Sequence, residues 1–88
     1  MSQKRYAYLI GANLSSANLS GADFTRANLT EADLSGANLT GAIFNGTKLS
    51  NADLSLAYLE STILVNTDLS YANLTYCWKD HKFATSDA

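Results

Sequence analysis

The residues of this chain that could take part in chemistry do not form a catalytic set. Serine and threonine hydroxyls are plentiful, but they recur at a fixed spacing and suit turn positions better than nucleophile positions. Cys77 is the only cysteine, which excludes an internal disulfide, and no second catalytic partner can be named for its thiol. His81 is the only histidine, and Asp80 is its one neighbouring carboxylate. We therefore predict no enzyme activity and no cofactor.

Asp33 and Asp53 are the best candidates for a cation site. They lie twenty residues apart, with Glu31 near the first, and two carboxylates about 5 Å from each other could hold a divalent ion. The two charges repel by only about 1 kcal/mol in water, so we favour a solvated acidic face with no metal. Asn13 and Asn73 fall on that same face and suggest a ladder of side-chain hydrogen bonds.

A repeat of five residues sets the positions of these polar groups. Its centre is Leu or Phe in fourteen consecutive units, from Leu9 to Leu74, without an insertion. The residue two before the centre is Ala in eleven units and Thr in three, and the residue just before it is Asn or Asp in nine. Ser or Thr follows the centre in ten units, and all five glycines stand two residues after it.

Only a short strand that turns every five residues suits this period. An α-helix would advance about 500° per unit and scatter the leucines around every face. A long flat strand would place successive leucines on opposite faces. With a corner after each strand, Ala and Leu point inward, Asn or Asp points outward, and Ser, Thr, Asn or Gly forms the corner. Four such corners close a coil, so fourteen units predict about three and a half coils stacked about 4.8 Å apart.

The segments AlaAsnLeuSerSer at 12–16 and AlaAspLeuSerGly at 32–36 resemble the consensus A(D/N)LXX of the pentapeptide-repeat family. The resemblance implies an all-β fold, a right-handed quadrilateral parallel β-helix with one inward ladder of Leu or Phe and one of Ala. It also implies a cyanobacterial source, because small proteins of this family are abundant in cyanobacteria.

The pattern divides the chain into three expected segments. Residues 1–6 form a lead-in or cap, residues 7–76 form one β-helix, and residues 77–88 form a C-terminal cap and tail with a short helical turn after Trp78. An open solenoid end exposes core and unpaired strand edges. Apolar and aromatic residues at the two ends either cap the stack or, at the C-terminal end, form a dimer interface; they are Tyr6, Tyr8 and Ile10, and Tyr76, Cys77, Trp78 and Phe83.

Binding specificity should lie where the repeat pattern breaks. Most apolar replacements at outward and corner positions fall in the third coil and beyond, and an exposed apolar patch usually marks a contact surface. Ile43 and Ile63 should stack on one face, where either a partner or the chain's own tail covers them. The candidate interaction surface comprises Ile43, Leu56, Tyr58, Ile63, Val65, Tyr71, Tyr76 and Trp78.

Charge and hydropathy restrict the class of partner. A net charge of −2, from six basic and eight acidic residues, argues against binding to nucleic acid or an anionic membrane. No apolar run approaches the roughly 18 residues of a membrane span. The apolar run at 6–10 is too short for a signal-peptide core, so we expect a cytoplasmic protein, or one of another compartment if a targeting segment has been cleaved.

The function that these observations favour is a non-catalytic structural or protein-interaction module. Its partner is an unknown protein or a second copy, which would form a homodimer through the C-terminal end. The alternative comes from the family resemblance. Some long, dimeric relatives mimic B-DNA and bind type II topoisomerases such as gyrase, which protects these enzymes from quinolones.

Overall fold

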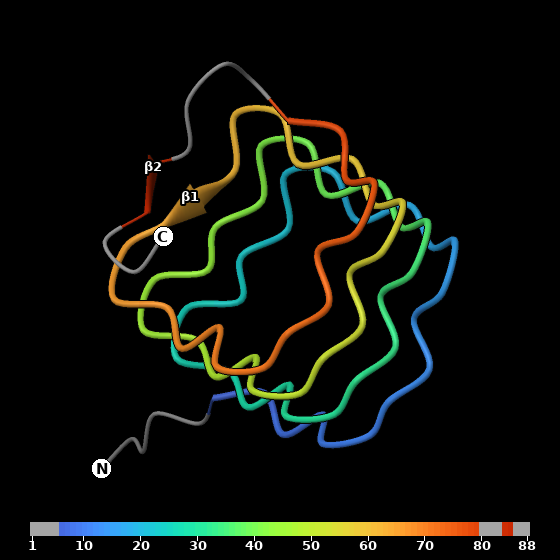
Figure 1. Cartoon of the computed structure of the whole chain (residues 1–88). Helices are drawn as coiled ribbons and strands as arrows, with labels where there is room; N and C mark the ends of the chain where they lie inside the picture. Colours follow the sequence, from blue (N-terminus) through green and yellow to red (C-terminus); the bar gives the residue numbers. More distant parts are fainter. Residues whose placement is uncertain (1–5, 80–83, 86–88) are drawn as a thin grey trace, which may run out of the picture.

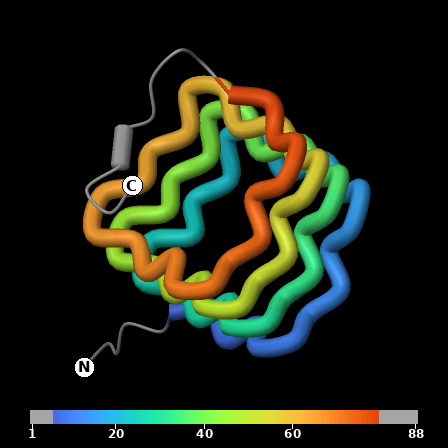
Figure 2. The backbone as a smooth tube through the Cα atoms, viewed as in Figure 1, coloured from blue at the N-terminus to red at the C-terminus, as the bar shows by residue number. Residues whose placement is uncertain are grey.

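The computed structural model describes residues 6–79 and 84–85. The chain winds as a stack of coils, so that segments far apart in the sequence lie side by side (Figure 1 and Figure 2). Within the described residues, two strands are longer than one bridged residue: β1 (Ile63–Leu64) and β2 (Ala84–Thr85). The remaining pairing consists of isolated parallel bridges, as expected when each strand is very short.

Successive coils pair in parallel at an offset of twenty residues. Bridges of this kind run from Tyr8–Asn28 to Tyr58–Trp78. At each bridge, the residue before the repeat centre bonds back to the preceding coil through both backbone groups. The Asn28 N–H donates to the Ala7 oxygen at 2.9 Å, and the Asn28 oxygen accepts from the Leu9 N–H at 2.8 Å. The backbone therefore provides a continuous ladder between coils.

The corners lie two residues after each centre, where the backbone adopts positive φ in every unit. The five glycines have φ of 66–73°, and nine other residues have φ of 56–63°. Asn or Asp before the centre supports the corner: Asp33 Oδ1 accepts from the Ser35 N–H at 3.0 Å and from Ser35 Oγ at 2.6 Å. Because corners recur every five residues and bridges every twenty, each coil has four sides.

The expected ladder between asparagine side chains on the acidic face is wrong. Asn13 Oδ1 accepts from Ser15 Oγ at 2.8 Å, and Asn73 Oδ1 accepts from the Thr75 N–H at 3.0 Å. The side-chain oxygens thus bond within their own unit. The physical reason is that the corner holds a donor two residues along the chain within hydrogen-bond distance, whereas neighbouring coils are spaced about 4.8 Å apart.

The inward ladders are confirmed. Leu29, Leu34 and Leu39 are fully buried, and Ala37 and Ala42 are buried beside them. The narrow interior explains the alternation of large and small side chains, because packed cores leave little room for extra volume.

Two kinds of contact join neighbouring coils inside the core. The rings of Phe24 and Phe44 stack with centroids 5.2 Å apart and an interplanar angle of 10°. The three threonines at alanine positions donate their hydroxyls to backbone oxygens one coil earlier, as buried polar groups require. These bonds are Thr47 to Phe24, Thr62 to Leu39 and Thr67 to Phe44, at 2.6, 3.0 and 2.7 Å.

The C-terminal segment returns to the stack as β2. It pairs in parallel with β1, with Ile63 opposite Ala84 and Leu64 opposite Thr85, an offset one residue longer than elsewhere. The helical turn expected after Trp78 falls mainly on residues 80–83, which lie outside the described residues, as do Asp80, His81 and Phe83. No helix in the described part of the chain is long and apolar enough to cross a membrane.

Candidate interaction surface

Four of the eight candidate residues form one surface, which we call the aromatic corner: Leu56, Tyr58, Tyr76 and Trp78. Leu56 and Tyr76 occupy corner positions one coil apart, and Tyr58 and Trp78 occupy outward positions one coil apart. Between 47% and 80% of each side chain is exposed. The rings of Tyr58 and Trp78 are stacked, with centroids 6.5 Å apart and an interplanar angle of 9°.

The stacked rings stand between two hollows. One, of about 360 Å³, is lined by Leu56, Tyr76, Cys77 and Trp78. The other, of about 280 Å³, is lined by Tyr58, Glu60, Trp78 and Lys79. Glu60 and Lys79 were not among the residues predicted from the sequence. Glu60 could have been found, because it stands where most units have Ser or Thr after the repeat centre, and so it breaks the pattern as Val65 does. The surface thus combines an aromatic ridge with two largely apolar hollows, of which the second also has Glu60 and Lys79 in its lining.

Cys77 lies at the edge of the core behind this surface. Its Sγ donates to the Leu54 backbone oxygen at 2.9 Å. Burial raises the pKa of the Cys77 thiol, and a backbone hydrogen bond from Ala57 opposes part of that effect. The thiol is therefore a poor nucleophile at neutral pH, which agrees with the expected structural role.

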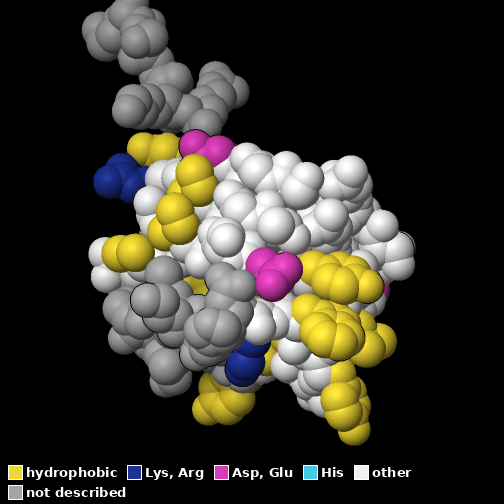
Figure 3. Space-filling model, turned by 90° about the horizontal axis from the view of Figure 1, so that it is seen from above, with side chains coloured by type: hydrophobic (Ala, Val, Ile, Leu, Met, Phe, Trp, Pro, Cys, Tyr) yellow, Lys and Arg dark blue, Asp and Glu magenta, His cyan; other side chains and the backbone are white. Residues whose placement is uncertain are grey.

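The other candidates do not join the aromatic corner. Ile43 and Ile63 stack as expected through their bridge, and Val65 is 45% exposed two residues further on. β2 pairs with β1 along the axis of the stack, and Ile63 keeps 37% of its surface exposed, so the covering of this face by a partner or by the tail stays a prediction. Tyr71 stands at a different corner and is 89% exposed. Figure 3 shows that hydrophobic side chains on the visible face gather in separate places.

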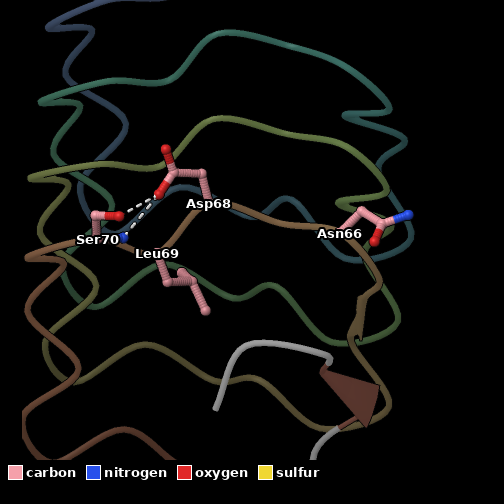
Figure 4. A pocket seen from close by; sticks show the side chains of 4 residues that line it. All are labelled: Asn66, Asp68, Leu69 and Ser70. Carbon is pink, nitrogen blue, oxygen red and sulfur yellow. Dashed lines mark hydrogen bonds between the residues drawn. The ribbon is translucent and has the colours of Figure 1, made fainter.

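A wider hollow of about 600 Å³ is lined by Asn66, Asp68, Leu69 and Ser70 (Figure 4). Asp68 Oδ1 accepts from the Ser70 N–H at 3.0 Å and from Ser70 Oγ, while the Leu69 side chain points to the opposite side of the strand. The hydrogen bond from the Ser70 hydroxyl lowers the pKa of the Asp68 carboxyl, with further lowering from the Ser70 N–H and from Lys48. Among the described residues that line this hollow, Asp68 is the one titratable group.

The acidic pair considered for a cation is occupied by hydrogen bonds. Asp33 and Asp53 bridge adjacent coils, but each Oδ1 accepts from its own unit, from Ser35 and Ser55 respectively. In residues 6–79 and 84–85, no group of three or more His, Cys, Asp or Glu residues could hold a metal ion. These carboxylates stabilise corners.

Comparison with known proteins gives a consistent set of matches. The family model described as Pentapeptide repeats matches residues 7–46 and 44–75, with eight copies. The solved structure of Rfr23, a pentapeptide repeat protein from the cyanobacterium Cyanothece 51142, is 33% identical with a TM-score of 0.56, over 91% of this chain and 58% of that one. A pentapeptide repeat protein from the Arabidopsis thaliana thylakoid lumen is 29% identical with a TM-score of 0.58, over 92% of this chain and 59% of that one.

A third solved structure is a trypsin-treated form of QnrB1, a plasmid-mediated fluoroquinolone resistance protein. It is 29% identical with a TM-score of 0.55, over 85% of this chain and 41% of that one. This chain thus spans less than three-fifths of the length of each of the three relatives. The comparison with curated proteins gave no match. The structural neighbours imply that the coils form a right-handed β-helix.

Proposed function

We propose a function from the premise that the chain belongs to the pentapeptide-repeat family. The proposal is that it acts as a non-catalytic protein-interaction module and binds a partner protein at the aromatic corner. The observation that carries this proposal is the exposed stack of Tyr58 and Trp78 between two hollows. Trp and Tyr side chains beside pockets are the groups that dominate binding energy at protein interfaces.

The rest of the molecule supports a scaffold role. The expected division into residues 1–6, 7–76 and 77–88, with about three and a half coils, remains our proposal for the organisation of the chain. In it, a rigid β-helix presents the residues that depart from the repeat. We also propose a cytoplasmic location, with the thylakoid-lumen relative as the reason to examine a second compartment.

Affinity capture with three forms of the full chain tests the aromatic corner. Wild type, Trp78→Ala and Tyr71→Ala are immobilised and exposed to the same native extract. Tyr71→Ala is the matched control, because it removes an exposed ring at another corner. We expect a partner that is retained by wild type and Tyr71→Ala and lost from Trp78→Ala. Equal retention by all three forms would show that the aromatic corner is not the binding site.

A second copy of the chain is the other candidate partner. Tyr76 and Trp78 belong to the last coil, so a homodimer through the C-terminal end would also use them. Sedimentation equilibrium of wild type and Trp78→Ala tests this idea. If both sediment as monomers at high concentration, the C-terminal homodimer is excluded.

The likeness to QnrB1, a fluoroquinolone resistance protein, favours one alternative function, a DNA mimic that binds a type II topoisomerase. A mimic of this kind needs a long acidic rod, whereas this chain has a net charge of −2 and spans 41% of QnrB1. We therefore expect no inhibition in a gyrase supercoiling assay. Inhibition at concentrations near that of the enzyme would replace the interaction-module proposal with this alternative.

A further inference from the structure

The N-terminal end of the stack presents one half of a backbone hydrogen-bond ladder. Among the described residues, the backbone N–H and C=O groups of Asn13, Asn18 and Asp23 have no backbone partner. The same groups one coil further on are fully used. The Asp33 N–H donates to the Ala12 oxygen at 2.8 Å, and the Asp33 oxygen accepts from the Leu14 N–H at 2.7 Å. The first coil therefore carries the groups that would pair with a preceding coil.

The C-terminal end presents the other half. The N–H groups of Leu69 and Leu74 and the oxygens of Thr67 and Ala72 have no backbone partner in the part of the chain that the structure describes. One coil earlier, the equivalent groups pair with the next coil: the Leu54 N–H donates to the Asn73 oxygen at 2.8 Å, and the Ala52 oxygen accepts from the Asn73 N–H at 2.9 Å. The last coil therefore carries the groups that would pair with a following coil.

The two end faces also match in outline. The first four bridges begin at Tyr8, Asn13, Asn18 and Asp23, one on each side of the coil. At the other end, Asp68, Asn73 and Trp78 pair on three sides, and β2 pairs with β1 on the fourth. Both ends thus present paired segments on four sides, because β2 supplies the fourth.

Both faces leave part of the leucine ladder uncovered. Leu9, Leu14 and Leu19 at one end, and Leu69 and Leu74 at the other, are only partly buried, whereas equivalent leucines between them are fully buried. Stacking one face on the other would bury these side chains and pair the open backbone groups. Unpaired strand edges of this type are templates for another chain.

We propose that the occupant of these faces is a second copy of this chain, stacked head to tail so that its first coil continues the ladder of the last. The contact is heterologous, so it leaves an open face at each end and continues to longer assemblies. It goes beyond the proposed function, because it uses the backbone of the end coils and does not depend on the aromatic corner.

A proline at an N-terminal edge position provides the test. Asn13→Pro removes an N–H that has no backbone partner within the described chain, so it should leave the monomer folded while it blocks stacking. Asn13→Ala is the matched control, because it also loses the side-chain bond to Ser15 but keeps the N–H. Asp33→Pro removes an N–H that donates to the Ala12 oxygen, so it should lower the melting temperature. This variant shows how much a proline destabilises the fold where the N–H is already paired within the chain.

Light scattering coupled to size exclusion across a wide concentration range gives the readout. We expect the mass of wild type and Asn13→Ala to rise above 9.4 kDa through a continuous series of multiples, and Asn13→Pro to stay monomeric with the melting temperature of Asn13→Ala. Wild type that stays monomeric throughout would overturn the proposal. So would an assembly that survives Asn13→Pro but is lost in Trp78→Ala, since that contact would lie between C-terminal ends.

Discussion

At the scale of the residue, the repeat works through bonds that each unit makes with itself. An outward Asn or Asp accepts hydrogen bonds from the Ser or Thr two residues later, as Asn28 does from the Thr30 N–H at 3.1 Å and from its hydroxyl at 2.7 Å. This bond holds the strand where it enters the corner. The Asn, Asp, Ser and Thr residues that make these bonds therefore stabilise corners in the folded chain.

Acid should weaken the fold through these carboxylates. Hydrogen bonds from the following Ser or Thr hydroxyl lower the pKa of Asp23, Asp33 and Asp68 below the ordinary value of 3.8. Their contribution to stability is complete above that ordinary value and is lost as the pH falls through the lowered pKa of the folded state. We expect the urea midpoint to fall as the pH drops below about 3.8.

The control for the acid experiment is a triple variant with Asp23→Asn, Asp33→Asn and Asp68→Asn. It keeps the oxygen that accepts the corner bonds but cannot titrate. Its urea midpoint should depend less on pH than that of wild type. An identical dependence in both proteins would assign the acid sensitivity to other groups.

The inward threonines should contribute through their hydroxyls. Thr47→Val keeps the shape of the side chain but removes the bond to the Phe24 oxygen, and we expect a loss of about 1 kcal/mol in the free energy of unfolding. Thr47→Ser, which keeps the hydroxyl, is the comparison. Urea denaturation measures both, and a Val variant as stable as wild type would show that the bond contributes nothing net.

At the scale of the element, the unit of structure is the side of a coil rather than a conventional strand. Each side pairs through one residue and then turns, so β1 and β2 are only two residues long. Cohesion comes from stacking of neighbouring coils, through the backbone ladder and the leucine ladder together. A side chain in the middle of the stack has a coil on each side of it, and a side chain at an end has only one.

Cavity-forming substitutions should reveal this difference. Leu34→Ala, in a fully buried position, should lower the free energy of unfolding by about 2–5 kcal/mol. Leu74→Ala, at a partly buried position of the last coil, should cost distinctly less because its surroundings can relax. If both variants lost the same free energy of unfolding in urea denaturation, the leucines of the last coil would be as fully enclosed as those in the middle of the stack.

At the scale of the whole molecule, the protein is close to a one-dimensional stack. Repeat arrays of this kind have stabilities set by each unit and its nearest neighbours, so opening should begin at the ends. Both ends have partly buried leucines and backbone groups that lack a backbone partner among residues 6–79 and 84–85. The aromatic corner belongs to the last two coils, so the proposed binding surface lies near one of the less protected ends.

Amide hydrogen exchange should map this gradient. We expect the slowest exchange in amides that donate between middle coils, such as those of Leu34 and Asp53 at 2.7 and 2.9 Å, and faster exchange in the amides of the last coil, such as Leu69. Bound partner should slow exchange near Trp78. Uniform protection along the chain would indicate one cooperative unit and contradict the stack description.

Much of the fold could be predicted from the sequence because one short repeat fixes it. The period of five excludes extended helices and strands, and the inward leucines, the Phe24–Phe44 stack and the threonine bonds all follow from an offset of twenty residues. The family followed from the same units. These features are local or strictly periodic, so no knowledge of distant contacts was needed.

The direction of the asparagine bonds and the shape of the candidate surface could not be predicted in this way. Whether Asn13 bonds along the ladder or within its unit depends on competing distances, and the stacking of the exposed Tyr58 and Trp78 rings beside two hollows depends on side-chain conformations that the period does not specify. The return of β2 to β1 carries no repeat signal, because it is one residue out of step with the other coils.

The sequence by itself determined the coil, its inward ladders and the absence of a recognisable catalytic set, because these depend on residue type and period. Only the tertiary structure decided that Tyr58 and Trp78 form a ridge between two hollows and that β2 pairs with β1. Both are contacts between segments that meet only after the chain has wound. The physical reason is that a five-residue period specifies how the coils stack, whereas the surfaces depend on the residues that break it.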